Sequence, residues 1–499
     1  MLTLDQFGIS EEDWNQTPAS VRAALMFLLQ QNQRLENRCY TYELEVQRLK
    51  AQLEGLKKLE LEVAELRERL GQNSQNSSKP PSSDPPSVSR PNNRQPSGRK
   101  RGGQPGHQGR ARKLLPPEQV DTVIKLRPTA CCKCGHLLPG DDPDPVRHQV
   151  GEIPPVKTEV TEYQQHRLTC AVCGEVTAAQ WPHEMPRGNF GPRAQAVVGY
   201  LTGRLGLSHR DVVEAMAALH GLSLSLGSVS TIQDHVSKAL EQPVGTAQQY
   251  VHQQPVNQVD ETIWPEGEKQ KWLWIDATPR VTVFRILAGR GQAQAKEVIG
   301  KGYQGIINTD RYAGYHWMDA HRRQLCWAHL KREFLAIKGR GGMSAETGDG
   351  LLEQVKEIFE AWRALKDGDL SPEGFQQKME PVQARVKELI ERGAACDQAK
   401  TRRTCENLLK HEISLWTFVR EEGVEPTNNN AERPLRRAVM WRRKSFGTQS
   451  ESGSRFVERI LTVVTSLRQQ GRDVLEYLTA ACRAALGQPS ACCLLPNSS

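Results

Sequence analysis

Three acidic residues stand in settings that suit metal-dependent chemistry: Asp260 in VNQVDETIW, Asp310 in GIINTDRYAGY and Glu432 in NNNAERPLRR. An ionised carboxylate inside an apolar, strand-like run is costly to bury unless a cation or hydrogen bonds compensate its charge. Magnesium is held by a few carboxylates and waters, which leaves coordination positions for phosphate oxygens. Two such ions can stabilise the attacking and the leaving oxygen of a phosphodiester displacement. The three residues therefore predict a two-magnesium site for chemistry on a DNA strand.

Short β-rich runs between residues 255 and 334 must position the two aspartates. VNQVDET, KWLWIDAT, VTVFRILAG and GIINTD predict four strands, and AQAKEVIG predicts a helix before the last of them. This order is typical of the opening of an RNase H-like fold, in which the first acid lies on the first strand and the second ends the fourth. Asp260 and Asp310 occupy these two places. Two alternative carboxylates are Asp276, expected in a solvent-facing or structural role, and Glu261, which alternates to the face opposite Asp260.

The segment around Glu432 predicts the start of a helix. The preceding asparagines cap helices well, and Pro434 indicates a helix start close by, so Glu432 is expected at the edge of that helix. Arg433, Arg436 and Arg437 would supply phosphate-binding guanidinium groups beside it. The alternative for Glu432 is an ordinary surface ion pair.

LCWAHLKREF predicts an apolar strand that ends with Cys326, Trp327 and His329, followed by a helix opened by Lys331 and Arg332. Two interpretations of the histidine stay open. His329 either orders a leaving group or a phosphate, or it is a packed, hydrogen-bonded side chain.

The N-terminal segment, residues 1–70, has the heptad pattern of a coiled coil. One seam comprises Leu28, Leu35, Tyr42, Leu49 and Leu56, and its companion comprises Leu25, Asn32, Cys39, Val46 and Leu53. Beyond residue 56 the spacing slips, which shifts the register. The pattern predicts a homodimer or a higher homo-oligomer; the alternative is a helix packed on its own protein.

Residues 71–115 are a Pro-, Ser- and Gly-rich stretch in which no apolar period survives, so they predict a flexible tether. From Arg90 to Lys113 this stretch holds eight Lys or Arg and no acid. Local basic blocks favour contact with nucleic acid, and Arg99, Lys100 and Arg101 form the centre of this one. The alternative is a linker whose charge only keeps it soluble.

Two Cys-x-x-Cys-Gly turns predict a structural zinc ribbon over residues 116–185. Cys131, Cys134, Cys170 and Cys173 would close the site with four thiolates, which leaves no open coordination position. Strand-like runs (HQVGEI and KTEVTEYQQHRL) separate the turns. Cys132 is an extra thiol that could change the choice of ligands, and redox pairing is the alternative use of the cysteines.

The remaining domain boundaries are predicted from helical periodicity. Residues 190–245 predict a helix-turn-helix-like DNA-binding region, with HRDVVEAMAALHG as its first helix and a Ser-rich cap before the second. Residues 250–448 would form the catalytic domain with a helical insertion at 345–425, and residues 449–499 a C-terminal helical segment and tail. The fold class is thus multidomain α+β.

Composition limits the cellular compartment and the kinds of partner that we expect. The 499 residues carry a formal net charge of +8 and contain no apolar run long enough to span a bilayer, so no membrane partner is expected. The N-terminus is acidic and has no apolar signal core, which argues against secretion. In such a chain, 12 cysteines are better interpreted as thiols or metal ligands than as a disulfide framework. We therefore expect a reducing cytoplasm.

The ordered motifs together resemble those of the insertion-sequence 66 family of bacterial DDE transposases. The similarity runs from the heptad helix, NSSKPPSSD and GQPGHQG through the cysteine turns to VDET, TDRYAGY, CWAHLKREF, NNNAERPLRR and SFGTQSESGSRFVERILTVVTSLRQQG. One position departs from the family pattern, because Thr427 stands where an aspartate commonly precedes the asparagines.

The resemblance implies that Asp260, Asp310 and Glu432 are a catalytic triad that binds two magnesium ions. It implies nicking at the ends of a mobile element and attack by the freed 3′-hydroxyl on target DNA, with double-stranded DNA as substrate. Binding of terminal inverted repeats, accessory proteins of the same element and a place at the bacterial nucleoid are further expectations. Two alternatives are a DNA-binding regulator with an inactive RNase H-like core and a nuclease that cuts without joining.

Overall fold

The computed structural model describes residues 8–73, 113–186, 188–489 and 493–496. The chain divides into two compact units, residues 1–88 and 89–499, each of which is described by itself. The centre of the basic tether, Arg99, Lys100 and Arg101, lies outside the described residues. No helix within the described ranges has the length and apolarity that crossing a bilayer requires.

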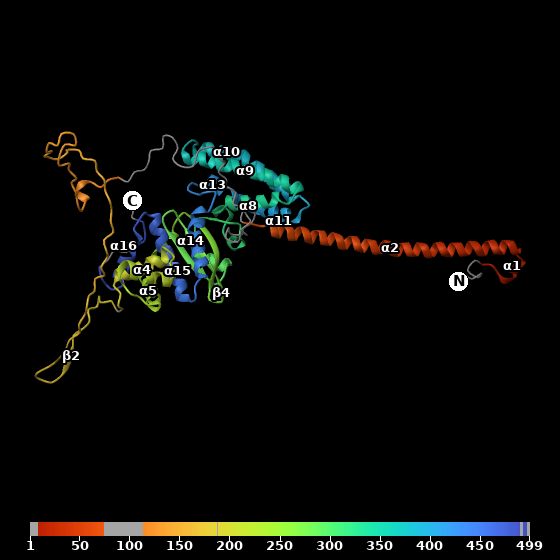
Figure 1. The fold of residues 1–499 in the computed structure, drawn as a ribbon. Coiled ribbons are helices and arrows are strands. Elements are labelled where there is room, and N and C mark those ends of the chain that lie inside the picture. The colour runs from red at the N-terminus through yellow and green to blue at the C-terminus, as the bar shows by residue number, and fades with distance from the viewer. Residues whose placement is uncertain (1–7, 74–112, 187, 490–492, 497–499) are drawn as a thin grey trace. The chain divides into compact units, whose positions relative to one another are not determined.

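The first unit is a short helix followed by a long one. α1 (Glu11–Gln16) begins after Ser10, whose hydroxyl accepts the Asp13 N–H. α2 (Ala19–Gly71) runs for 53 residues without interruption (Figure 1). The predicted heptad side chains are on its surface, with Leu35 54 % and Leu49 57 % exposed. Within its own unit the apolar stripe of α2 has no covering partner among the described residues, although isolated helices gain most of their stability from packing such a stripe.

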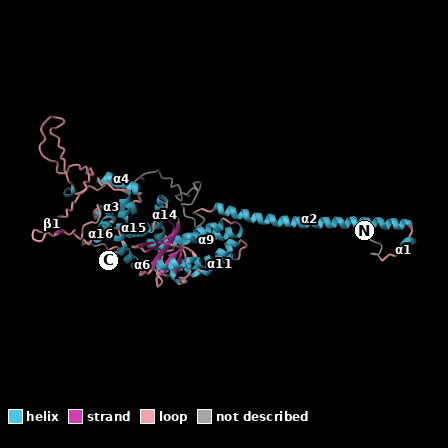
Figure 2. Cartoon of the chain, turned by 90° about the horizontal axis from the view of Figure 1, so that it is seen from below, coloured by secondary structure: helices cyan, strands magenta, loops and turns pink. Residues whose placement is uncertain are grey.

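The second unit is a mixed α+β body (Figure 2). Its strands are β1 (Arg167–Thr169), β2 (Val176–Ala178), β3 (Val256–Glu266), β4 (Lys269–Ala277), β5 (Thr282–Leu287), β6 (Ile306–Thr309) and β7 (Arg323–Leu325). Its helices are η3 (Pro117–Gln119), α3 (Pro192–Gly203), α4 (His209–His220), α5 (Leu226–Ala239), α6 (Glu241–Val251), α7 (Gln292–Ile299), η4 (Ala313–Tyr315), η5 (Ala320–Arg322), α8 (Trp327–Lys338), α9 (Gly342–Asp367), α10 (Pro372–Ala394), α11 (Ala399–Lys410), α12 (Glu412–Leu415), α13 (Thr417–Arg420), α14 (Asn429–Ser445), α15 (Glu451–Gln469) and α16 (Val474–Ala484).

A five-stranded sheet forms the centre of this body, in the order β5-β4-β3-β6-β7. β3, β4 and β5 are antiparallel neighbours, whereas β6 runs parallel to β3 and β7 parallel to β6. The three antiparallel strands, the helix α7 and the strand β6 confirm the predicted order of elements. Parallel pairing requires a crossover, and α7 lies in the connection from β5 to β6.

Helices cover both faces of the sheet. On one face, apolar side chains of β3, β4 and β5 pack against α14 and α15 (Figure 1). On the other face, Val259 and Trp274 pack against α7 and the η4 turn, which contributes Tyr315. Because successive strand residues point to opposite faces, both covered faces carry apolar side chains. A polar side chain that lies inside this sandwich must therefore have a specific partner or role.

The helices before the sheet share a core with the C-terminal helices. Buried side chains of α3, α4, α5 and α6 pack with those of α15 and α16, with Val281 just before β5 and with Val283 in β5. The predicted helix pair is confirmed as α4 and α5: Ser208 and Asp211 form a capping box at α4, Gly221 ends α4 at φ 62°, and Ser225 caps α5. This pair is built into the same core as the segment after residue 449.

The predicted helical insertion is present as α9 to α13, between β7 and α14. Together with α8 it has a core of its own, which includes Trp327, Phe375 and Trp416. The segment that leads from the insertion back to the sheet is held by one residue of β6. Asn308 on β6 donates its side-chain amide to the carbonyls of Glu425 (2.7 Å) and Thr427 (3.0 Å). Thr427, the position that departs from the family pattern, thus contributes a backbone carbonyl to this junction.

The region of the cysteine turns has less regular structure than predicted. HQVGEI forms no strand, and of KTEVTEYQQHRL only its end enters β1, which pairs with β2 across the second turn. Around the first turn there is only the bridge between Ala130 and Leu137. The strand predictions were wrong here because these segments are exposed and lack a partner strand among the described residues, so their β-propensity is not supported by packing.

Candidate functional site

The two aspartates lie at the ends of neighbouring parallel strands. The register pairs Gln258 of β3 with Asn308 of β6, so Asp260 and Asp310 each follow the last paired residue by two positions. Side chains two positions apart on a strand point to the same face, which here is the face covered by α14. Glu432 lies in the first turn of α14. The fold therefore directs all three predicted acids to one edge of the sheet.

The electrostatics of Asp260 support this proximity. Its pKa is well above the usual value because the carboxyl is buried and because Glu261, Asp310 and Glu432 repel its charge. The Glu261 backbone N–H donates to Asp260 Oδ1 (2.9 Å), which offsets only part of this cost. A set of close carboxylates with an unfavourable negative charge fits the oxygen-donor preference of a divalent cation. Asp260, Asp310 and Glu432 are thus chemically suited to hold magnesium.

Asp310 is held by the backbone that follows it. Its Oδ1 accepts the Tyr312 N–H (2.9 Å), and its backbone carbonyl accepts a hydrogen bond from Arg323 (2.8 Å). Arg323 is only 2 % exposed and also donates Nε to Thr309 Oγ1 (3.0 Å). Burial lowers the pKa of Arg323 to about 10, so the guanidinium stays charged near neutral pH. The loop after β6 is therefore tied to β7.

Glu261 belongs to the opposite face, as its alternation predicted. It accepts a hydrogen bond from Arg290 Nε (2.6 Å) and another from the Tyr315 hydroxyl. Burial and the nearby Asp310 raise its pKa to about 7, while Arg290 opposes that rise. Arg290 also lies 3.7 Å from Asp310 and stacks over the ring of Tyr312 at 3.8 Å. Glu261 is thus a support for Arg290 rather than a free carboxylate.

Asp276 is buried, with 1 % exposure, so a solvent-facing position is excluded and a structural one remains. It pairs with Val259 across β3 and β4 and shares the face of that residue. Neither carboxyl oxygen has a hydrogen-bond partner in the structure. Burial raises the pKa of Asp276 well above the usual value, and the nearby Asn257 amide offsets this only in part.

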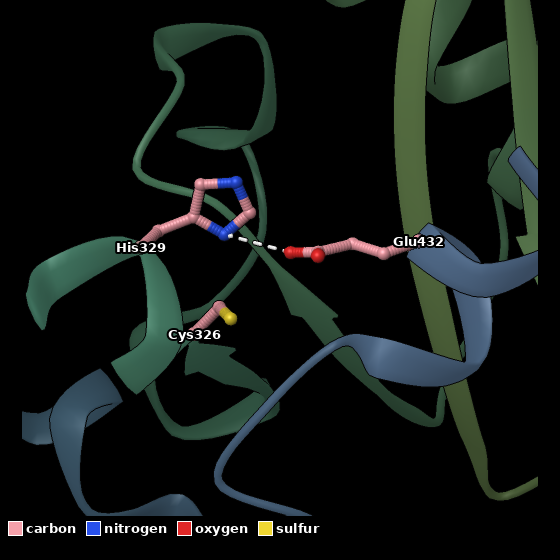
Figure 3. A group of neighbouring side chains, drawn as sticks. All are labelled: Cys326, His329 and Glu432. Atoms are coloured by element: carbon pink, nitrogen blue, oxygen red, sulfur yellow. Dashed lines mark ion pairs between the residues drawn. The ribbon is translucent and has the colours of Figure 1, made fainter. Parts of the chain in front are cut away.

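His329 lies in the first turn of α8, not at the end of a strand as predicted, because β7 ends at Leu325 and Cys326 is the N-cap of α8. Its Nδ1 faces Glu432 Oε1 at 3.4 Å (Figure 3). Neither atom has a hydrogen bond, and Arg332 lies 3.9 Å from the same Glu432 oxygen. Burial and Arg332 lower the pKa of His329, so the imidazole is neutral. The Nδ1 atom of this packed histidine thus makes no hydrogen bond, and the two interpretations of His329 stay open.

Cys326 connects the starts of α8 and α14. Its sulfur accepts the backbone N–H of Asn428 (3.4 Å), the N-cap residue of α14, and Trp327 N donates to the Pro426 carbonyl (2.9 Å). Burial, with the charge of Glu432, raises the pKa of the Cys326 thiol to about 12. The position of Glu432 thus depends on residues about a hundred positions earlier in the chain.

α14 begins earlier than Pro434 indicated. The helix starts at Asn429, Pro434 lies inside it, and the N-cap Asn428 makes no side-chain capping bond. Both polar side-chain atoms of Asn428 are buried without a partner. The capping prediction was wrong because Asn428 is drawn into the junction with Cys326 instead of facing its own helix. Glu432 nevertheless occupies the predicted first turn.

The predicted arginines of α14 lie on its outer side. Arg433 and Arg436 are exposed, whereas Arg437 is half-buried. Burial lowers the pKa of Arg437, and so does the positive charge of Arg204 and Arg468. The positive charges of Arg204 and Arg468 thus act unfavourably on Arg437, and an anion such as a phosphate would offset this repulsion.

The cysteine turns form two equivalent knuckles. Gly135 N donates to the Cys131 carbonyl (3.0 Å) and Gly174 N to the Cys170 carbonyl (2.9 Å), with both glycines at positive φ. Backbone N–H groups two and three positions on, and the second cysteine of each knuckle, lower the pKa of Cys131 and Cys170. Cys132 is exposed.

The structure does not bring the two knuckles together. Among the described side chains, the one group of three or more possible metal ligands is Cys326, His329 and Glu432. Neither the four knuckle cysteines nor Asp260, Asp310 and Glu432 place three ligand atoms within 4.8 Å of one another, so the four-thiolate zinc site and the two-magnesium site both stay predictions.

Sequence reasoning missed several residues at this site. Arg290, Arg323 and Arg332 place three guanidinium groups around the acids, and Cys326 was noted without a role. No spacing in the sequence marks the arginines, since they come from the loop before α7, from the strand β7 and from the helix α8. The Cys-x-x-His spacing at Cys326 was the one signal that could have identified a ligand pair.

Comparison with known proteins gives a family for most of the second unit. Residues 187–455 match the family model described as Transposase IS66 family. Residues 20–113 match a second model, described as a family of unknown function. The matched range of the first model contains Asp260, Asp310 and Glu432.

Two curated relatives from Sinorhizobium fredii (strain NBRC 101917 / NGR234) are similar to the chain, and both are described as uncharacterized. Protein y4qI is 26 % identical over 264 residues, which is 46 % of this chain and 48 % of the relative. Protein y4hP is 24 % identical over 406 residues, which is 74 % of this chain and 72 % of the relative. The chain thus spans about half the length of one relative and more than two thirds of the other.

Proposed function

Because the chain belongs to the IS66 family of transposases, we propose that it cleaves DNA at the terminal inverted repeats of an insertion sequence and transfers the freed strand into target DNA. The observation that carries this proposal is the placement of Asp260, Asp310 and Glu432 at one edge of the sheet. They come from two adjacent parallel strands and the first turn of α14, and the charges of the latter two raise the pKa of Asp260.

The strand order supports an RNase H-like catalytic core. Three antiparallel strands are followed by two parallel ones, with β3 in the centre of the order β5-β4-β3-β6-β7. On this assignment Asp260 lies on the first strand and Asp310 directly after the fourth. The long insertion α9 to α13 then separates the aspartates from the glutamate.

In this mechanism Asp260, Asp310 and Glu432 would hold two magnesium ions, which stabilise the attacking and the leaving oxygen of the phosphodiester when bound. Arg290 keeps a positive charge 3.7 Å from Asp310 and is itself oriented by Glu261. The backbone N–H of Tyr312 fixes one oxygen of Asp310, which leaves the other for a ligand. These contacts pre-organise the carboxylates, so little rearrangement is needed when the substrate binds.

DNA contact is proposed for the outer side of α14 and for the basic tether. Arg433, Arg436 and Arg437 would hold phosphates beside Glu432, and the crowding of Arg437 by Arg204 and Arg468 supports an anion at that place. The α4–α5 pair would read a groove as a helix-turn-helix does. Arg99, Lys100 and Arg101 would add sequence-independent attraction.

Assembly is proposed through α2. Its exposed heptad stripe would be buried in a homodimer or higher homo-oligomer, which would bring two catalytic units to the two ends of one element. The two cysteine knuckles would close on one structural zinc ion. Accessory proteins of the same element are expected partners.

The test is magnesium-dependent cleavage of a DNA fragment that carries the presumed element ends. Wild-type protein is expected to produce 3′-hydroxyl cuts at the ends, whereas Asp260→Ala and Glu432→Gln bind the DNA and leave it intact. Asp276→Asn is the matched control, since it alters a buried acid of the same sheet on the other face and should still cleave. Retained cleavage by Asp260→Ala would refute the assignment. If the wild type and all variants bind the DNA and none of them cuts it, a DNA-binding regulator is favoured.

A further inference from the structure

Cys326, His329 and Glu432 bring together donor atoms of three kinds. The cysteine sulfur, an imidazole nitrogen and a carboxylate oxygen all lie within 4.8 Å of one another (Figure 3). Magnesium prefers oxygen donors alone, whereas zinc and similar ions take sulfur, nitrogen and oxygen. This donor set therefore differs in kind from the carboxylates proposed to hold magnesium.

The backbone at Cys326 repeats the pattern of the two cysteine knuckles. In those knuckles, the N–H groups two and three positions after Cys131 and Cys170 interact with the sulfur. At Cys326 the N–H groups of Ala328 and His329, again two and three positions on, do the same. Cys326-x-x-His329 thus has the spacing of the knuckles with histidine in the second place, although here Cys326 is the N-cap of α8 and the backbone continues as a helix. The N–H of Asn428 is a further donor to the sulfur at 3.4 Å.

One polar atom each of His329 and Glu432 makes no hydrogen bond, although the two atoms lie within ion-pair distance of each other. His329 Nδ1 and Glu432 Oε1 are buried and face each other at 3.4 Å, yet neither makes a hydrogen bond. Buried polar atoms without a hydrogen bond are rare and destabilising. A cation between the sulfur, the nitrogen and the oxygen would satisfy all three. Arg332, at 3.9 Å from the same oxygen, is the one positive charge recorded beside this group that such an ion must tolerate.

We propose that Cys326, His329 and Glu432 bind one thiophilic divalent cation of the zinc class, at a site that shares only Glu432 with the proposed two-magnesium site. Binding replaces the thiol proton with a sulfur–metal bond and releases that proton to solvent. Three protein ligands leave a fourth position open, as in zinc sites that exchange ligands rather than closed structural ones.

A consequence rests on the proposed function. Glu432 would belong to both sites, so an ion held by Cys326 and His329 engages the Oε1 atom and competes with magnesium for this carboxylate. Zinc is therefore expected to inhibit magnesium-dependent cleavage, and Cys326→Ser is expected to reduce that inhibition.

The direct test measures ion binding by the full chain without DNA or magnesium, with Co²⁺ as the spectroscopic probe. The two cysteine knuckles are unchanged in every variant, so their absorption cancels in difference spectra. Relative to wild type, Cys326→Ser and His329→Gln should each bind about one Co²⁺ fewer per chain. Cys326→Ser should also lose part of the thiolate–cobalt absorption. Cys482→Ser, which alters a buried thiol in another core, is the matched control and should match wild type.

Equal stoichiometry and equal spectra for wild type, Cys326→Ser and His329→Gln would overturn the proposal. His329→Gln leaves the thiol in place, so its result does not depend on whether the cysteine variant folds. Circular dichroism checks that both variants are folded. Asp260→Ala should bind Co²⁺ like wild type while losing cleavage. Failure of the metal site and failure of the proposed function therefore give different results.

Discussion

Replacement of Asp276 by asparagine is expected to stabilise the second unit, and increasingly so as the pH rises. The carboxyl is 1 % exposed and neither oxygen has a hydrogen bond. The one polar group that offsets its burial is Asn257, whose amide already donates to the Val251 carbonyl (3.0 Å). The folded protein therefore keeps this acid protonated at pH values where the unfolded chain ionises it.

The sign and the size follow from proton linkage. The pKa of Asp276 is raised on folding, so its contribution is fully present below the unfolded value of about 3.9 and is lost as pH rises toward the folded pKa. Within that window the wild type loses about 1.4 kcal/mol of stability per pH unit relative to a variant that cannot ionise. For a large folded body this corresponds to a difference in Tm of roughly 2 °C per pH unit.

The assay is thermal unfolding of wild type, Asp276→Asn and the control Asp369→Asn, each between pH 5 and pH 8. Asp369 is exposed, so its replacement should change Tm little at any pH. The Tm of Asp276→Asn should rise relative to wild type with increasing pH. A difference that stays constant across this range would refute the reasoning, because it would mean that the folded protein ionises Asp276 as readily as the unfolded chain.

Three further predictions concern DNA, assembly and packing. Arg436→Gln should lower the salt dependence of DNA binding by about 0.9 in the slope of log K against log salt, since an exposed arginine that holds one phosphate is lost; fluorescence anisotropy at several salt concentrations measures it, and an unchanged slope argues against this contact. Leu35→Glu with Leu49→Glu should convert the oligomer to monomer in light scattering, because both side chains lie on the exposed stripe of α2; a variant that keeps the wild-type mass contradicts assembly through that stripe. Gly203→Ala should destabilise the second unit by about 1–3 kcal/mol, because the new methyl group would overlap the γ carbons of Ile460 on α15; in an Ile460→Ala background, which removes those carbons, the same change should lower Tm less, and no loss at all in the wild-type background would contradict the close packing.

Local patterns in the sequence were enough to predict the helices and strands around the site and the order of the acids along the chain. The strand runs around Asp260 and Asp310, the helix between them and the α4–α5 pair with its serine caps are confirmed, because period and capping act over a few residues. The same local reasoning failed where tertiary packing determines whether a segment forms a strand or a side chain caps a helix. The strands expected near the cysteine turns are absent from the described residues, and Asn428 does not cap α14.

Tertiary structure decided what each acid can do. Asp260, Glu261 and Asp276 are all acids of strand-like runs, yet the sheet points Asp260 to α14, pairs Glu261 with Arg290 and buries Asp276 without a partner. The three arginines around the site and the contact of His329 with Glu432 join segments far apart in the chain. The sequence by itself determined which residues are available for chemistry, since their types and order are covalent. Which of them meet depends on strand register and on helix docking, and these are set by burial across the whole fold.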